Sequence, residues 1–161
     1  MTTTPAPNPE IVAFADPLIA AIERIFACLD GLDAEGLNWR PPAPLTNSLY
    51  VLAFHTMGSA EAAIIGELGG EHVERDRDAE FTVSGDSTAP LYARWRTLEP
   101  RLREMLNRLT AADMEKTVHH RRFGAMSGRA YLILQTQHPA EHAGHAELTR
   151  DLLKAARAYT D

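Results

Sequence analysis

Three of the seven histidines of this chain are clustered near its C-terminal end. His138, His142 and His145 lie within eight residues of one another, in an apolar segment with helical periodicity. Residues four apart share a helix face, with Cβ atoms about 5 to 6 Å apart, so His138 and His142 can offer two imidazole nitrogens to one ion. His55, in another apolar segment of helical periodicity, is the natural third ligand. We therefore predict a metal site formed by His55, His138 and His142.

The composition of this ligand set indicates the kind of metal site. Three protein ligands leave a fourth position open, as in catalytic zinc sites, whereas structural sites are usually closed by cysteines. The sequence has one cysteine, Cys28. We expect a divalent ion, zinc or nickel, with an open position that water or a thiolate can occupy. The alternative is a set of hydrogen-bonded core histidines, because histidines four apart also occur by chance.

Residues near this pattern receive secondary roles. His145 can replace His138 as a ligand or orient His142 by a hydrogen bond, and we favour the second role. Tyr131 lies two turns before His138 and is a candidate pocket residue that donates a hydrogen bond, although packing is the commoner role of a buried tyrosine. Pro139 removes a backbone hydrogen bond and disturbs the ideal geometry of the histidine pair.

Apolar residues spaced three and four apart predict the helices that must position these side chains. The first helix begins either at Asn8-Pro9, with a kink, or at Pro17. The residues that the last helix should place on its inner side are Ala130, Tyr131, Leu134, His138, residues 140–142, His145, Leu148, Leu152 and Leu153. The expected boundaries are residues 9 or 17 to about 31, 46–48 to 69, 89 to about 109, and about 127 to 159.

Long connectors join helices 1-2, 2-3 and 3-4. Residues 38–46 contain three prolines in four positions and must be extended. Residues 71–88 exceed the usual connection length, which indicates a crossover or a functional loop, and residues 110–128 form the third connector. Strand-like alternation is confined to a few residues. We therefore predict an all-α four-helix bundle, with either an up-and-down or a crossover topology.

Two of these connectors carry short arginine pairs, Arg75 with Arg77 and Arg121 with Arg122. We interpret both pairs as solvated loop charges. We also favour a surface position for His119 and His120, rather than a place at the mouth of the site. The net charge of -6 argues against a nucleic-acid partner, which normally meets a basic face.

Composition sets the class of protein. The 161 residues, 45% hydrophobic and 24% charged, predict a single soluble domain over residues 9–161, after a disordered leader at residues 1–8. The sequence shows neither the basic start and apolar stretch of a signal peptide nor a run of about 18 apolar residues that could span a membrane. We therefore expect no membrane partner. The single Cys28 excludes an internal disulfide and favours a reducing, cytoplasmic compartment.

Two segments together resemble the DinB/YfiT-like family of metalloenzymes. The second helix reads Asn47-Ser-Leu-Tyr-Val-Leu-Ala-Phe-His55-Thr-Met-Gly-Ser-Ala-Glu61, in which one histidine follows an Asn-Ser cap and an apolar turn. The last helix reads His138-Pro-Ala-Glu-His142-Ala-Gly-His145, similar to the family pattern of His or Glu, three residues, and then His-x-Gly-His. Trp39-Arg-Pro41 and residues 75–81 are also similar to the family, so the resemblance spans nearly the whole chain.

The resemblance implies a four-helix bundle, frequently a homodimer, that holds a divalent metal at His55, His138 and His142. Relatives include transferases and isomerases that use a low-molecular-weight thiol such as mycothiol, bacillithiol or glutathione. We therefore expect a metal-dependent enzyme that acts on a small molecule, as a thiol-dependent S-transferase or as a hydrolase. The alternatives are a metal- or ligand-binding stress protein without turnover, and an interaction module whose histidines fill a core that has lost its metal.

Overall fold

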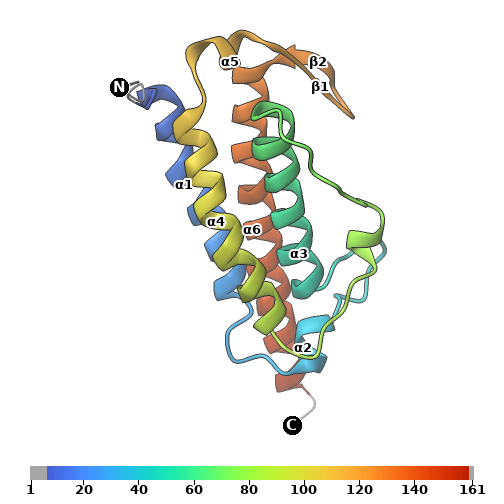
Figure 1. Ribbon diagram of the computed structural model, residues 1–161. Helices are drawn as coiled ribbons and strands as arrows, with labels where there is room; N and C mark the ends of the chain where they lie inside the picture. Colours follow the sequence, from blue (N-terminus) through green and yellow to red (C-terminus); the bar gives the residue numbers. More distant parts are fainter. Residues whose placement is uncertain (1–6, 160–161) are drawn as a thin grey trace.

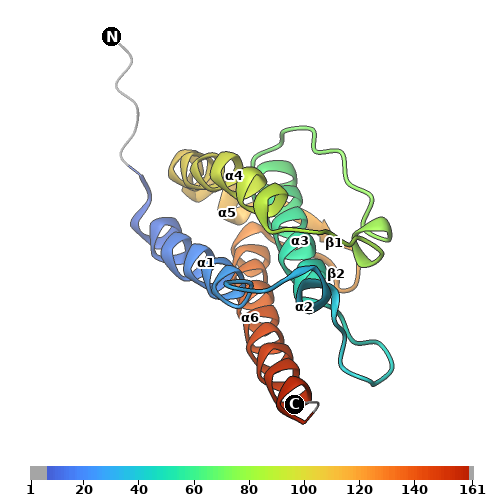
Figure 2. The same ribbon diagram turned by 90° about the horizontal axis from the view of Figure 1, so that it is seen from below.

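The computed structural model describes residues 7–159, which are mostly helical. Residues 1–6 of the predicted disordered leader therefore lie outside the described residues. The four long helical segments lie side by side (Figures 1 and 2). They are α1 (Pro9–Ala27), α3 (Leu49–Ala60) continued by the π-helix η1 (Glu61–Leu68), α4 (Ala89–Arg108) and α6 (Gly128–Ala158).

The first helix begins at the earlier of the two predicted starts. The Asn8 side chain accepts a hydrogen bond from the Glu10 backbone N–H at 2.9 Å, and Pro9 occupies the first turn, where its missing N–H costs nothing. Pro17 lies inside the helix. Ile11 and Ala15 are therefore helical, and both are buried.

The second long helix is almost completely buried. The Ser48 hydroxyl accepts the N–H of Val51 at 3.2 Å and starts α3, as predicted, and Gly70 with φ of 76° follows its π-helical end. The segment Leu49–Leu68 is long and apolar enough to cross a membrane, and 72% of its most apolar window is buried inside the protein. A core helix has the same composition, so packing accounts for its apolar character.

The connectors contain regular structure, which corrects the all-α prediction. A hairpin of β1 (Thr117–His120) and β2 (Gly124–Ser127) places His120 opposite Gly124, whose φ of 74° suits the end of a tight turn. Short helices α2 (Ala34–Asn38) and α5 (Ala111–Glu115) lie in the first and third connectors. The hairpin strands are four residues long, too short for alternation to be recognised in the sequence.

Residues 71–88 form a crossover, so the observed topology is the crossover one of the two predicted alternatives. They run back along the length of η1 and α3, which lets α3 and α4 point in the same direction (Figure 1). Asn38 of α2 exchanges hydrogen bonds with the Gly85 backbone at 2.8 and 3.1 Å and fixes the end of the crossover. A 3-10 helix, η2 (Ala79–Phe81), interrupts it.

The inner face of α6 is narrower than predicted. Its buried stripe is spaced three or four residues apart and consists of Tyr131, Gln135, Pro139, Ala143, Ala146, Thr149 and Leu153. Gly128 and Leu132 are buried beside this stripe, and the other residues of α6 are half-buried or exposed because their side chains point away from α1 and α3. The predicted inner positions that are exposed are Ala130, Ala140, Glu141, His145, Leu148 and Leu152.

Candidate metal centre

Three histidines meet where α3 faces α6. The ring of His55 lies 5.3 Å from that of His138 and 5.1 Å from that of His142, and the latter two are 4.5 Å apart, centroid to centroid. One nitrogen from each ring can be chosen so that all three lie within 4.8 Å of one another. A shared tetrahedral ion needs nitrogens about 3.3 Å apart, so the three rings would approach one another on binding it.

Pro139 does not separate the histidine pair. Helix α6 is continuous through it, and the proline ring is buried against the core. His138 and His142 therefore remain one turn apart on the same face, as the i, i+4 spacing predicts.

Two nitrogens of this cluster are buried without a partner. Within residues 7–159, His138 Nε2 and His142 Nδ1 make no hydrogen bond. A buried polar atom without a partner is costly, and most such atoms in folded proteins are paired. A cation bound by both nitrogens would remove this cost, so the residues present fit a metal ion.

The same two rings are held in the neutral form that binds metals. Burial, reinforced by neighbouring His55 and by Arg75 and Arg77, lowers the pKa of His138 from 6.5 to about 4. Burial together with the other histidines lowers the pKa of His142 to about 3. Both rings therefore offer lone pairs throughout the neutral pH range.

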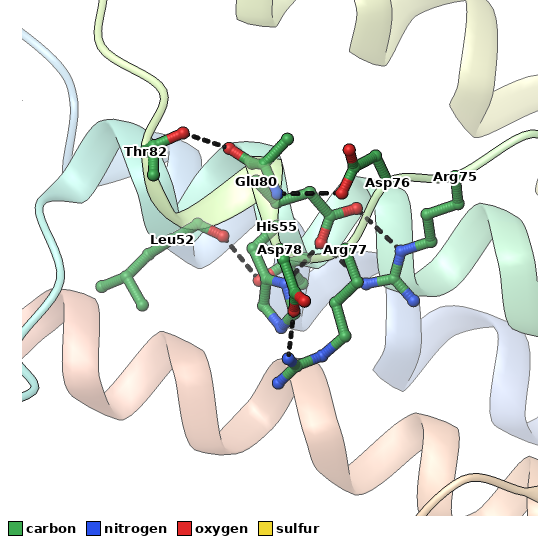
Figure 3. A network of polar contacts seen from close by, with 10 residues as sticks. Leu52, His55, Arg75, Asp76, Arg77, Asp78, Glu80 and Thr82 are labelled. Atoms are coloured by element: carbon green, nitrogen blue, oxygen red, sulfur yellow. Dashed lines mark hydrogen bonds and ion pairs between the residues drawn. The ribbon is translucent and has the colours of Figure 1, made fainter.

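Glu80 is a buried site residue that the sequence analysis missed. It is 4% exposed, and its carboxylate Oε2 accepts a hydrogen bond from His55 Nδ1 at 2.7 Å (Figure 3). A proton on Nδ1 leaves Nε2 of His55 as the nitrogen available to an ion, as in carboxylate–histidine–metal arrangements. Gly58, one turn after His55, makes room for this carboxylate, because a Cβ there would collide with Glu80 Oε1.

Arg75 holds Glu80 from the other side. Its Nε and Nη2 donate to Glu80 Oε1 and Oε2 at 2.7 and 2.8 Å. Burial alone would raise the pKa of Glu80, but the hydrogen bonds from Arg75 and His55 outweigh burial and keep the pKa below its usual value. The interpretation of Arg75 as a solvated loop charge is therefore wrong, since its side chain is 22% exposed and paired.

A cavity of about 440 Å³ reaches His55 and His138 from the surface. The crossover and the hairpin turn form part of its wall, so His119, His120 and both arginine pairs line it. The predicted surface position of His119, Arg121 and Arg122 is confirmed, because all three are exposed, but they line the cavity as well. Tyr131 also lines it, and burial and Glu67 raise the pKa of this tyrosine to about 12, so it keeps its proton. The lining includes His55, Ala63, Glu67, Arg75, Arg77, His119, His120, Arg121, Arg122, Phe123, Tyr131, Gln135, His138 and Glu141.

His145 lies apart from the converging nitrogens. Its side chain is exposed, and its ring centroid is 5.6 Å from that of His142. No hydrogen bond joins these two rings in the described part of the chain. An orienting role for His145 stays a prediction.

Comparison with known proteins agrees with this architecture. The sequence model of the DinB superfamily matches residues 18–146. A solved structure of a conserved protein from Enterococcus faecalis is similar, with a TM-score of 0.70 and 16% identity over 89% of this chain and 96% of that chain, which shows a shared fold. No curated protein gives a significant match. Because the family match covers most of its length, this chain belongs to the DinB superfamily.

Proposed function

We propose that this chain is a metal-dependent enzyme whose long helices form a four-helix bundle around one divalent ion, zinc or nickel. His55, His138 and His142 are the proposed ligands. The observation that carries the proposal is the pair of buried nitrogens, His138 Nε2 and His142 Nδ1, that lack a partner beside the third ring. Neutral imidazoles without a cysteine suit these two metals.

The cavity favours an enzyme over a metal-storing or purely structural protein. It connects His55 and His138 with the surface and, at about 440 Å³, has the size of a small-molecule site. A divalent ion bound there would supply Lewis acidity to a water or a thiol in the open position. A core in which histidines serve only packing needs no such opening.

The residues of this chain can bind and orient a small molecule beside the ion. Glu80 fixes the orientation of His55 through its 2.7 Å hydrogen bond. Tyr131 and Gln135 line the cavity and offer a hydroxyl proton and an amide to a substrate. Glu141 also lines the cavity, whereas His145 does not, so Glu141 is the better proton acceptor for a hydrolase.

Two nucleophiles fit the proposed site, and they define the two candidate reactions. A low-molecular-weight thiol would make the protein an S-transferase, and water would make it a hydrolase. The exposed Leu148 and Leu152, one turn apart on α6, together with the family resemblance, support a homodimer. We propose a cytoplasmic location on the basis of the lone, buried Cys28. Light scattering coupled to size-exclusion chromatography tests the dimer.

Metal content tests the proposal. Protein purified without an affinity tag or chelator should contain close to one zinc or nickel per chain by elemental analysis. His142→Ala should lose this metal and keep its helical circular dichroism, because a ligand is removed and the helix is not. His72→Ala is the matched control, since His72 is an exposed histidine of the crossover. Equal metal in wild type and His142→Ala, or no uptake by wild type on titration, would overturn the ligand set.

A further inference from the structure

The cavity wall concentrates positive charge that the metal proposal does not use. Arg75 and Arg77 from the crossover and Arg121 and Arg122 from the hairpin turn all line it. The chain as a whole has a net charge of -6, so this wall reverses the average charge of the protein. A concave surface of one sign raises the local concentration of ligands of the opposite sign.

The two arginine pairs differ in how far they are neutralised. Arg75 is paired with Glu80, and Arg77 contacts Asp78 at 3.5 Å while its guanidinium lies over the Phe81 ring. No ion pair among residues 7–159 includes Arg121 or Arg122, although Glu67 and Glu141 line the same cavity. The Arg122 guanidinium lies over the Phe123 ring, which provides no negative charge, so both hairpin arginines are available to an anionic ligand.

Neutral hydrogen-bond donors stand next to the hairpin arginines. His120 Nδ1 accepts the backbone N–H groups of Arg122 and Phe123 at 3.1 and 3.2 Å, which places the ring proton on Nε2. The ring centroids of His120 and Tyr131 are 5.9 Å apart, and both side chains line the cavity. Tyr131 adds a second donor, so this part of the wall offers donors and positive charge together.

We propose that the hairpin turn binds the anionic group of a small molecule, a carboxylate or a phosphate, between Arg121 and Arg122. Guanidinium groups bind both kinds of anion through paired, charge-assisted hydrogen bonds. The remainder of the molecule extends along the cavity toward His55 and His138. That extension rests on the proposed function, whereas the anion site itself needs no metal.

Calorimetric titration with simple anions tests the proposal. Succinate and ethyl phosphate are the probes, and succinamide is the neutral counterpart of succinate. A variant with Arg121→Gln and Arg122→Gln should bind the better anion at least about 10-fold more weakly than wild type, because charge-assisted hydrogen bonds are lost. The control carries Arg96→Gln and Lys154→Gln, which remove the same charge at exposed positions outside the cavity and should change binding little.

Two further comparisons keep the test decisive. Arg122→Lys retains the charge and should retain more affinity than Arg122→Gln, and thermal melting of every variant confirms that the hairpin substitutions leave the fold intact. A preference for succinate or for ethyl phosphate identifies the anion. Failure of both anions to bind, equal binding by the two double variants, or binding of succinamide as tight as that of succinate would overturn the proposal.

The titrations are run on metal-loaded and on chelator-treated protein, with the metal content of each sample measured. Metal uptake without dependence on the hairpin arginines would refute the anion site and leave the metal enzyme standing. Arginine-dependent anion binding by protein that takes up no metal would refute the metal enzyme and leave the anion site standing.

Discussion

Two regions meet at the cavity and are built by opposite physical means. The floor is the histidine cluster (His55, His138 and His142), of which His55 and His138 line the cavity, and the rim is the set of four arginines in its wall (Arg75, Arg77, Arg121 and Arg122). The floor stands on long helices, and its rings on α6 are neutral because burial lowers their pKa. The rim stands on connectors and is charged and more accessible. A rigid, neutral floor suits metal ligation, which depends on geometry, whereas a charged rim suits recognition of anions, which depends on the electrostatic field.

One contact joins these two regions. The crossover supplies Glu80, which binds His55 of the floor and Arg75 of the rim through the same carboxylate. The crossover therefore does more than connect α3 to α4, because it orients a proposed ligand. Substitutions in the floor, in this link and outside both should have graded effects on metal binding.

The largest effect is expected from the floor, where His55→Ala and His138→Ala should both lose stoichiometric metal. They should differ in the stability of the metal-free protein. His55→Ala deprives the buried carboxylate of Glu80 of one partner, at a cost of about 1–3 kcal/mol, whereas His138 Nε2 has no hydrogen bond to lose. Urea unfolding of chelator-treated proteins measures this difference. Equal destabilisation would show that the His55–Glu80 contact contributes little.

Substitution of Glu80 should weaken metal binding less than loss of a ligand, and more than substitution of an exposed neighbour. Glu80→Gln removes the negative charge that orients His55 and should weaken metal binding about 10- to 100-fold. Competition with a chromophoric chelator measures the affinity. Asp78→Asn is the control, because Asp78 is an exposed neighbour that does not touch the floor. If Glu80→Gln bound the metal as tightly as wild type, the Glu80 carboxylate would not orient His55 for metal binding.

Acid should destabilise the metal-free protein through the floor. Unfolded His138 and His142 bind protons near pH 6.5, but folded they do so at about 4 and about 3. The free energy of unfolding should thus be constant above about pH 7 and decrease as pH falls toward 5, by at most about 1.4 kcal/mol per pH unit for each ring. Urea unfolding at pH 7, 6 and 5 tests this. A variant with His138→Gln and His142→Gln should show a flatter profile; an unchanged slope would contradict the assignment.

The smallest effect is expected from His145→Ala. The side chain is exposed and makes no hydrogen bond to His142 in the described residues, so the affinity for metal should fall less than in Glu80→Gln. The same chelator competition compares the two variants. A larger loss for His145→Ala would restore it as the main orienting partner of His142.

Helix periodicity accounts for what could be predicted. The starts of α1 and α3 follow from the caps Asn8 and Ser48, and the meeting of His55 with the α6 pair follows from their shared apolar faces. These patterns are local, since a cap or an i, i+4 pair is fixed by neighbours in the sequence. Leu148 and Leu152 show the limit of such patterns, because an apolar residue is buried only where a partner helix covers it.

The connectors escaped prediction because their contacts are long-range. Glu80 is one of many acidic residues in a polar stretch, and its burial depends on His55, 25 residues away, and on the space beside Gly58. The hairpin strands are too short for alternation to be recognised, so the sequence indicated the exposure of the two turn arginines but not their place in the cavity wall. A glycine at position 58, one turn after a candidate ligand, was the available signal that another group approaches this face of α3.

X-ray absorption at the metal edge tests the central claim most directly. Protein reconstituted with zinc in the absence of thiols should show three imidazole nitrogens at about 2.0–2.1 Å and one further light atom, as expected for an open three-histidine site. The double variant at Arg121 and Arg122 should give the same spectrum, because the rim is separate from the floor. A spectrum without imidazole scattering, or one with sulfur at about 2.3 Å, would contradict the account.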